Sequence, residues 1–489
     1  MAIHRHDKHE SANAAMEWVD KRLPVTKVWN EHLAEYIAPK NFNFWYYFGS
    51  LAILVLVIQL VTGIFLTMHY KPDAALAFAS VEYIMRDVPA GWLIRYMHST
   101  GASAFFVIVY LHMFRGVIYG SHREPRELVW LIGCVIFVAL MAEAFMGYLL
   151  PWGNMSYWGA QVIISLFDVI PYFGPILTEW IRGDFVVSDA TLNRFFAFHV
   201  ILLPLVLVAL VFLHLVALHQ VGSNNPDGID IYDNVDEDGK PLDGIPFHPY
   251  YTVKDLVGVG VFLMIYVGVI FFAPDMGGIF LEKDNFAPAN PLQTPPDIVP
   301  LWYFTPFYSI LRASTESLLQ FFAYGSIAIA LLAALLVKKS AIWRVAFLIV
   351  GALAFVIFTN TTGKAWGVIL MGGAIVCFFL LPWLDRSPVK SIRYRSSPFK
   401  IALGFFLVAF VILGALGMNA PSDCVGNPVS NLGSVLYGVI TFSYGGMPCK
   451  TLLAQVGTVV YFAFFILMPW FTSIGETKPL PDRLTSSTH

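Results

Sequence analysis

Four histidines in apolar parts of the chain have a spacing suited to metal ligation. His98 and His112 are fourteen residues apart in one apolar stretch. A second stretch carries His199 and His214, which are fifteen residues apart. On an α-helix these separations place both members of a pair on nearly the same face, about 21–22.5 Å apart. One further apolar stretch lies between the two, so both helices would cross a membrane in the same direction.

The first members, His98 and His199, would then face each other near the outer side of the membrane. The second members, His112 and His214, would face each other near the inner side. Opposed imidazoles are the axial ligands of a six-coordinate haem. A single histidine in a membrane helix is more often a hydrogen-bonded packing residue, but two pairs on two helices predict two stacked haems.

Glycines repeat at the same interval in the two neighbouring apolar stretches. Gly49 and Gly63 are fourteen residues apart, as are Gly133 and Gly147. A flat macrocycle between helices requires bare backbone where it approaches most closely, and glycine supplies it. Packing of small residues between membrane helices is the alternative, but the shared interval favours haem.

Three arginines lie close to the histidines in sequence, where haem propionates would need a counter-charge. Arg95 precedes His98 by three residues, Arg115 follows His112 by three, and Arg194 precedes His199 by five. Because each arginine is near the end of an apolar stretch, snorkelling of its side chain to the membrane interface is the alternative interpretation.

The composition is that of an integral membrane protein. Of the 489 residues 57% are hydrophobic and 13% are charged, against about 45–50% and about 25% in soluble proteins. The mean hydropathy is +0.66. A net charge of −3 offers no basic field for nucleic acid, and four scattered cysteines are too few for an iron–sulfur or zinc framework.

Ten apolar stretches are long enough to cross a hydrocarbon core as helices. The first 43 residues are polar and contain no region typical of a cleavable signal peptide, so the first stretch is expected to act as an uncleaved anchor. The predicted spans are residues 44–69, 93–119, 129–149, 191–219, 253–272, 318–337, 342–358, 366–383, 401–418 and 452–471.

Clusters of Lys and Arg set the predicted orientation, with both termini on the cytoplasmic side. The densest cluster lies at residues 386–400. On the opposite side we expect an amphipathic segment at 155–183 and a proline-rich, ordered, non-helical lid or re-entrant segment at 273–306. The acidic loop at 224–244 is expected to be a solvated cytoplasmic insertion, and no segment has a strand pattern.

Several segments resemble the cytochrome b subunit of bacterial cytochrome bc complexes, the ubiquinol:cytochrome c oxidoreductases. The resemblance covers most of the chain except the N-terminal arm, the acidic loop and roughly residues 313–363. The matching segments are GWLIRYMHSTGAS (91–103), AFMGYLLPWGNMSYWG (144–159), ATLNRFFAFH (190–199), LHQVGSNN (218–225), IPFHPYYTVKD (245–255) and DRSPVKSIRYR (385–395).

The resemblance implies two b-type haems and two quinone sites on opposite sides of a bacterial inner membrane. At the outer site quinol would give one electron to a Rieske iron–sulfur protein and one to the outer, low-potential haem. The inner, high-potential haem would reduce quinone at the inner site, with coupled proton translocation. A cytochrome c-type subunit and a homodimer of the complex are the other implied partners.

The family's site residues can be carried over to matching positions. Aromatic walls suit an apolar quinol, and polar groups receive or deliver its protons. The outer site is expected to contain Phe145, Tyr148, Gly159, Pro300, Trp302 and Tyr303. The inner site is expected to contain His219, Ser223, Lys254 and Asp255.

The resemblance also divides the chain into six parts. These are a cytoplasmic arm (1–43), a dihaem four-helix bundle (44–222), the acidic loop (223–252), the fifth span with the outer lid (253–312), an inserted transmembrane hairpin (313–364) and a three-helix C-terminal part (365–489). The family usually has eight spans. An inserted pair of spans keeps every later loop on the same side of the membrane as in the family. Contact with lipid or with another subunit is the simplest role for this pair.

One departure from the family concerns proton transfer. The outer site normally contains Pro-Glu-Trp-Tyr, but here Pro300 is followed by Leu301, which cannot accept a proton. Glu143 is the predicted replacement, because a carboxyl group in an apolar span is costly and by default a functional candidate. A hydrogen-bonded helix contact is the alternative role for Glu143. Asp297 is a weaker candidate for the acceptor.

A second departure is the fifteen-residue spacing of the second histidine pair, where many relatives have fourteen. Pro204 lies in that helix and frees backbone groups, so a local π-type bulge is expected to absorb the extra residue. Cys424 and Cys449 both fall in the loop between the last two spans, on the oxidising side. A disulfide there is one prediction, and two free thiols are the other.

Two other classes of protein remain as alternatives. A transporter with buried histidines would be colourless when purified. A dihaem membrane anchor of a dehydrogenase or hydrogenase would pass electrons without dividing them between two acceptors. The outer lid with Pro300, Trp302 and Tyr303 argues against the anchor, which needs a single quinone site.

Overall fold

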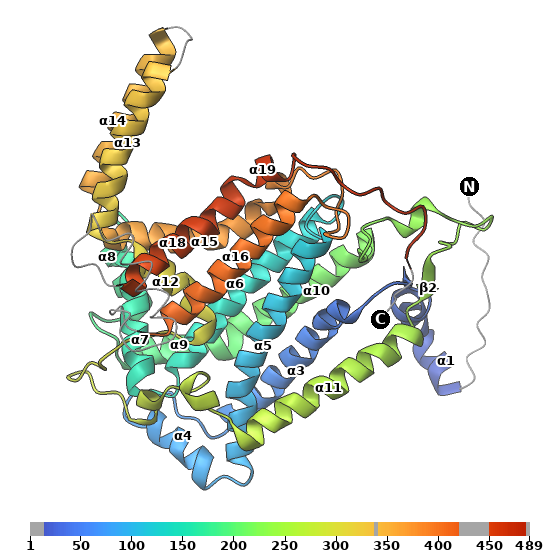
Figure 1. Ribbon diagram of the computed structural model, residues 1–489. Helices are drawn as coiled ribbons and strands as arrows, with labels where there is room; N and C mark the ends of the chain where they lie inside the picture. Colours follow the sequence, from blue (N-terminus) through green and yellow to red (C-terminus); the bar gives the residue numbers. More distant parts are fainter. Residues whose placement is uncertain (1–13, 337–340, 420–448, 486–489) are drawn as a thin grey trace.

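The computed structural model describes residues 14–336, 341–419 and 449–485, which are predominantly helical (Figure 1). Within these ranges nine helices are long and apolar enough to span a membrane. The protein is thus an all-α integral membrane protein, as predicted. The nine spans are Phe44–Thr67, Gly91–Tyr119, Glu127–Leu149, Asp189–Val221, Tyr250–Phe272, Glu316–Leu335, Ala341–Asn360, Gly363–Leu384 and Ser397–Gly417.

The tenth predicted span, residues 452–471, is interrupted. Helix α18 covers Cys449–Ile466, and a separate short helix, α19, covers Met468–Phe471. Pro469 lies in the first turn of α19. Because proline lacks an N–H group, it starts a new helix more readily than it continues the previous one. Cys424 and the side chain of Cys449 lie outside the described residues.

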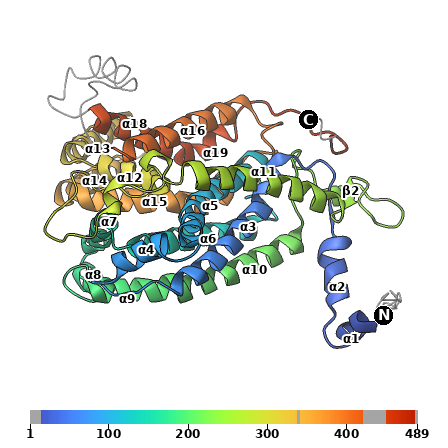
Figure 2. The same ribbon diagram turned by 90° about the horizontal axis from the view of Figure 1, so that it is seen from below.

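The histidines belong to a bundle in the N-terminal half of the chain. Helix α3 packs along α5, and α6 packs along α10 (Figures 1 and 2). His98 and His112 are both on α5. The bundle consists of α3 (Tyr47–Thr67), α5 (Gly91–Tyr119), α6 (Glu127–Leu149), and α9 (Asp189–Ala197), which continues through η4 (Phe198–Leu202) into α10 (Leu203–Val221).

Segment η4 is one turn of π-helix, and it contains His199. Pro204 follows in the first turn of α10. The predicted bulge is therefore present. It adds one residue to the turn, which compensates for the fifteen-residue spacing between His199 and His214.

The C-terminal helices pack around a buried aromatic core. Helix α12 contacts α15, α16 and α18, while α11 lies against α3 and α5. Phe307, Phe399 and Tyr461 are among the large side chains that are almost fully buried there. The helices are α11 (Tyr250–Phe272), α12 (Thr305–Ala313), α15 (Gly363–Leu384) and α16 (Ser397–Gly417).

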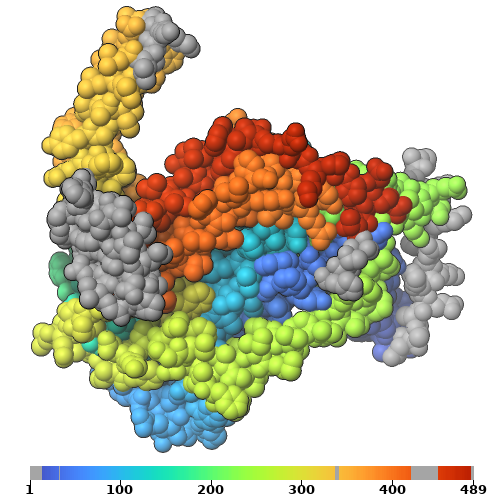
Figure 3. Space-filling view, in the orientation of Figure 1, coloured from blue at the N-terminus to red at the C-terminus, as the bar shows by residue number. Residues whose placement is uncertain are grey.

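The predicted hairpin insertion consists of α13 (Glu316–Leu336) and α14 (Ala341–Asn360). The two helices pack on each other and project away from the remaining helices (Figures 1 and 3). At its base, the N–H group of Gly363 donates to Glu316 Oε1 at 2.7 Å. The hairpin therefore adds apolar surface without adding to the histidine bundle.

One end of the bundle, here called the outer end, is covered by short helices and by the lid, residues 273–301. The lid is ordered and mostly irregular, with two 3₁₀ turns, and a third turn follows it. Backbone and side-chain hydrogen bonds join it to α7. The short elements are α4 (Ala77–Arg86), α7 (Asn154–Ser165), η3 (Leu166–Val169), α8 (Gly174–Arg182), η6 (Met276–Gly278), η7 (Lys283–Phe286) and η8 (Trp302–Phe304).

The opposite, inner end contains a small antiparallel sheet, which corrects the expectation that no strand would form. Strand β1 (Ile37–Pro39) pairs with β2 (Gly244–Pro246), with Ala38 opposite Ile245. Strands of only three residues, whose partners lie so far apart in the sequence, leave no local pattern to recognise. The other inner elements are α1 (Ala14–Asp20), α2 (Val25–Trp29), the π-turn η1 (Asn30–Ala34), η2 (Phe44–Tyr46) and η5 (Ile231–Asp233).

The acidic loop is only partly solvated, so the prediction of a solvated insertion was wrong for two of its carboxylates. Asp236 and Asp238 are exposed, but Asp227 and Asp243 are 0% and 2% exposed. Their burial is compensated by partners from distant segments. Asp227 accepts from Asn41, Arg393, Tyr394 and Thr485, and Asp243 accepts from Lys40, Arg483 and the N–H group of Leu484.

Candidate functional site

The two histidine pairs face each other as the spacing predicts. The ring centroids of His98 and His199 are 6.1 Å apart, and those of His112 and His214 are 6.4 Å apart. A metal–imidazole bond is about 2.0–2.1 Å long, a length taken here from zinc sites. Rings at this separation therefore leave room for one metal atom that is bonded to both imidazoles. Each pair therefore fits the axial ligation of a haem, and the ligand role itself stays a prediction.

Each of the four glycines lies against one of the four histidine rings. A Cβ atom at Gly63 would lie 3.3 Å from Cε1 of His98, and one at Gly147 would lie 2.4 Å from Cε1 of His199. The corresponding distances from Gly49 to His112 and from Gly133 to His214 are 3.5 and 3.4 Å. A Cβ atom would therefore clash with the imidazole at Gly147 and be tight at Gly63, whereas at Gly49 and Gly133 it would make an ordinary van der Waals contact.

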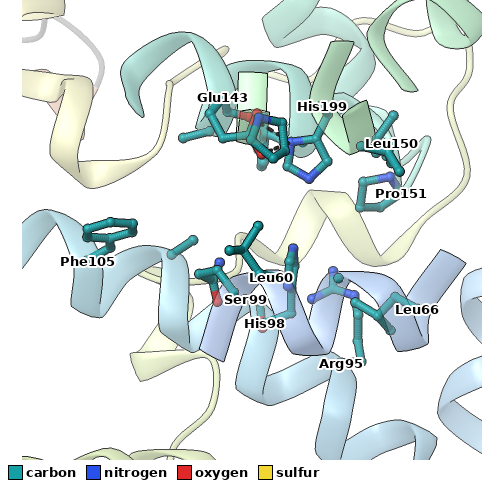
Figure 4. Close-up of a pocket in the computed structure, with 18 of the residues that line it drawn as sticks. Leu60, Leu66, Arg95, His98, Ser99, Phe105, Glu143, Leu150, Pro151 and His199 are labelled. Carbon is teal, nitrogen blue, oxygen red and sulfur yellow. Dashed lines mark hydrogen bonds and ion pairs between the residues drawn. The ribbon is translucent and has the colours of Figure 1, made fainter. Parts of the chain in front are cut away.

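A largely apolar cavity of about 560 Å³ surrounds the outer pair. Both histidines, Arg95 and Glu143 line it, with Arg95 and His98 on the side of α5 and Glu143 and His199 on the opposite side (Figure 4). Its wall also contains Tyr148, Leu301 and Tyr303. The predicted outer haem site and part of the predicted quinol site therefore adjoin each other.

Glu143 contacts the outer histidine directly. Its Oε1 atom is 3.0 Å from Nδ1 of His199 (Figure 4), and its backbone carbonyl oxygen is also 3.0 Å from that nitrogen. Among the described residues, the buried Oε2 atom of Glu143 has no hydrogen-bond partner. The structure thus places Glu143 beside a predicted haem ligand. Its predicted role as the proton acceptor stays a prediction.

The three arginines differ in where they point. Arg95 lines the outer cavity, and Nη2 of Arg115 is 3.4 Å from Nδ1 of His112. Arg194 is exposed and donates instead to the backbone oxygen of Trp180 in α8. Arg95 and Arg115 are therefore near the histidine pairs, whereas the structure does not bring Arg194 to the cavity.

The predicted outer-site residues form two groups. Tyr148 and Tyr303 reach the cavity, and Gly159 lies against Tyr148, because a Cβ there would be 3.7 Å from the Tyr148 ring. Trp302 and Phe145 contact neighbouring elements instead. Trp302 Nε1 donates to Ser103 Oγ at 3.2 Å, and Phe145 packs against Phe195. Pro300 precedes them in the lid and is partly exposed.

Sequence reasoning missed the partner of Tyr148. The phenol of Tyr148 donates to Glu282 Oε2 at 2.9 Å. Glu282 lies in the lid, just before η7, and is partly buried. Burial raises the pKa of Glu282 to about 7. The only signal in the sequence is a carboxylate in a lid that also contains other acidic residues, so a local pattern does not single it out.

Two of the four predicted inner-site residues, His219 and Ser223, contact Tyr36, a residue that the sequence did not suggest. The ring of Tyr36 lies 5.0 Å from the ring of His219, and its hydroxyl is 3.2 Å from Ser223 Oγ. Lys254 lies on α11 over the ring of Tyr250, 4.5 Å from the centroid. Asp255, also on α11, lies beside Ser50 of α3.

Comparison with known proteins agrees with this geometry. The model of the family "Cytochrome b/b6/petB" matches residues 33–222, and that of "Cytochrome b(C-terminal)/b6/petD" matches residues 288–362 and 352–438. Cytochrome b of Allochromatium vinosum is 55% identical over 475 residues, which cover 96% of this chain and 98% of that protein. The chain belongs to the cytochrome b family.

Other members of the cytochrome b family align over similar lengths. Cytochrome b of Rhodobacter capsulatus is 43% identical, covering 98% of this chain and 96% of that protein. A solved chain of a hyperthermophilic respiratory Complex III has a TM-score of 0.74 and 32% identity, covering 94% of this chain and 99% of that one. This cytochrome b is therefore a homologue of a subunit of a respiratory redox complex.

Proposed function

We propose that this cytochrome b is the haem-bearing catalytic subunit of a quinol:cytochrome c oxidoreductase that translocates protons across a bacterial inner membrane. The observation that supports this most directly is the presence of two opposed histidine pairs in one bundle, each flanked by glycines. Pairs at the two ends of the bundle provide a route for electrons from one membrane side to the other.

His98 and His199 would hold the outer b-type haem, and His112 and His214 the inner one. When bound, these groups supply one-electron transfer. Arg95 would bind a propionate of the outer haem, and Arg115, which lies beside His112, a propionate of the inner one. Glu143 would orient the imidazole of His199 through its 3.0 Å contact, in the manner of a carboxylate behind a histidine ligand.

At the outer end, the cavity would bind quinol between aromatic side chains. Tyr148 and Tyr303 supply hydroxyl groups, while Phe145, Trp302, Pro300 and Gly159 shape the surrounding walls. One electron of quinol would pass to a Rieske iron–sulfur protein and the other toward His199. Because the electrons are divided in this way, the second electron would cross the membrane to the inner end, where quinone would be reduced.

At the inner end, quinone would be reduced by the electrons that arrive beside His214. Its two carbonyl oxygens require hydrogen-bond donors and two protons. His219, Ser223, Lys254 and Asp255 supply such groups, and Tyr36 joins the first two. The remaining partners would be a cytochrome c-type subunit, a second copy of the complex, and the lipid bilayer.

The test is electron transfer in the purified complex. Quinol should reduce cytochrome c, and the inner haem should become reduced when quinone reduction is blocked. The optical spectrum should contain two haem components that titrate at separate potentials. A colourless protein would contradict any haem role. Transfer of both quinol electrons to a single acceptor would instead favour a dihaem anchor.

A further inference from the structure

A carboxyl group, that of Glu282, lies next to a residue of the outer cavity wall, away from the position where the family normally has its proton acceptor. Leu301 occupies that position, and it is 7% exposed and buried in the apolar core. Tyr148, on the cavity wall, hydrogen-bonds out of the cavity to Glu282 in the lid, at 2.9 Å. A carboxylate is therefore one hydrogen bond away from any quinol that contacts Tyr148.

The lid holds Glu282 in this position through its own contacts. Asn285, three residues later, accepts a hydrogen bond from the N–H group of Ser156 at 2.9 Å. The N–H group of Asn154 donates to the carbonyl oxygen of Ala287, also at 2.9 Å. These bonds join the lid to α7 directly after Glu282, whose side chain contacts Tyr148 near the end of α6.

The other titratable groups near this hydrogen bond are few. Tyr303 in η8 and Asp284 in the lid are the further groups whose charges act on Tyr148. Asp284 and Lys283 are exposed, and neither contributes to the raised pKa of Glu282, which is caused by burial and opposed by the Tyr148 hydrogen bond. Glu282 is thus the carboxyl group of this set whose pKa is raised, to about 7, by burial.

We propose that Glu282 accepts one of the two protons of quinol through the phenol of Tyr148. This inference rests on the proposed quinol oxidation. The quinol O–H bond breaks, its proton passes to the Tyr148 oxygen, and the proton of Tyr148 passes to Glu282. The two electrons go to the one-electron acceptors named above, an iron–sulfur protein and a haem. The second proton leaves by another route, and the product is quinone.

The experiment uses the whole purified complex and measures quinol:cytochrome c turnover from acidic to alkaline pH. In the unmodified complex kcat should fall as pH decreases through about 7, because protonated Glu282 accepts no proton. Glu282→Gln should lower kcat about a hundredfold, the low end of the range of roughly 10²–10⁴-fold for general acid–base catalysis. It should also remove that inflection, with KM and both haem spectra unchanged.

Two further variants separate a proton-transfer role from a structural one. Glu282→Asp retains an acceptor and should restore most of the turnover, with a shifted inflection. Glu179→Gln, which changes an exposed carboxyl group of α8, is the control and should behave like the unmodified complex. The proposal is overturned if Glu282→Gln retains both kcat and the inflection, or if Glu282→Asp leaves the inflection in place. An unmodified complex that does not oxidise quinol would contradict the proposed function instead.

Discussion

The outer and inner ends of the bundle are held together by different interactions. At the inner end, distant segments are joined by buried ion pairs. At the outer end, the lid is joined to α7 by neutral hydrogen bonds such as those of Asn285 and Asn154. A buried ion pair resists both rearrangement and protonation, whereas neutral contacts leave a carboxyl group such as Glu282 able to titrate near pH 7.

Asp385 shows the inner-end pattern most clearly. It accepts from Nε2 of His122 at 2.9 Å and from Nη2 of Arg395 at 2.5 Å, and all three side chains are buried. Burial alone would raise the pKa of Asp385, but the His122 hydrogen bond and the Arg395 charge hold it below its ordinary value. This carboxylate is therefore a structural anion rather than a proton carrier.

The two ends should lose their haems independently, which is the largest effect expected. Replacing His214 with Ala should abolish the inner haem while the outer haem remains, because the two pairs share no ligand. Replacing His199 with Ala is the matched variant for the outer haem. Difference spectra and haem content per protein measure both. Loss of both haems from a folded His214 variant would contradict separate pairing.

The next largest effect is expected when a glycine beside each histidine pair is replaced with alanine, because the outer and inner ends differ in how closely the glycine approaches the imidazole. A Cβ at Gly147 would be 2.4 Å from His199, which forces a rearrangement, whereas a Cβ at Gly133 would be 3.4 Å from His214. We expect Gly147→Ala to reduce the outer haem content, since overpacking costs about 1–3 kcal/mol. Gly133→Ala should leave the inner haem content nearly normal. Equal losses in both variants would show that the two ends are equally crowded.

Removing the inner anion should destabilise the fold without changing quinol chemistry. Asp385→Asn should cost about 3–5 kcal/mol, the range for breaking a buried pair. Since the pKa of Asp385 is lowered by folding, its contribution is present above the unfolded pKa of about 3.9 and is lost as pH falls further. Thermal unfolding of the solubilised complex measures this effect. Glu237→Gln, at an exposed position, is the control and should change little.

The smallest predicted effect is electronic. Glu143→Gln removes a negative charge beside His199 and should raise the potential of the outer haem by roughly 60 mV, a tenfold change for a one-electron couple. The inner haem should not shift. Redox-titrated spectra measure both potentials. If Glu143 also accepts a proton, the same variant should slow quinol oxidation and change its pH profile; unchanged turnover at every pH would remove that role.

The facing histidine pairs, the glycines beside them and most of the membrane spans could be predicted from the spacing of residues along the sequence. These features depend on helix geometry, which is local, and on the need of a membrane helix to be apolar along its whole length. The π-turn at Phe198–Leu202 could also be predicted, because the extra residue and Pro204 are both visible in the same helix. Family motifs identified the two ends at which quinone chemistry is proposed.

Only the tertiary structure showed the contacts that join distant segments. Tyr148 and Glu282 are 134 residues apart in sequence, and Asp227 meets Thr485 across 258 residues. No local pattern specifies which irregular loop covers a bundle end, because its position depends on hydrogen bonds to other elements. For the same reason the acidic loop was expected to be solvated: the free energy of a buried carboxylate depends on partners that become neighbours only when the chain folds.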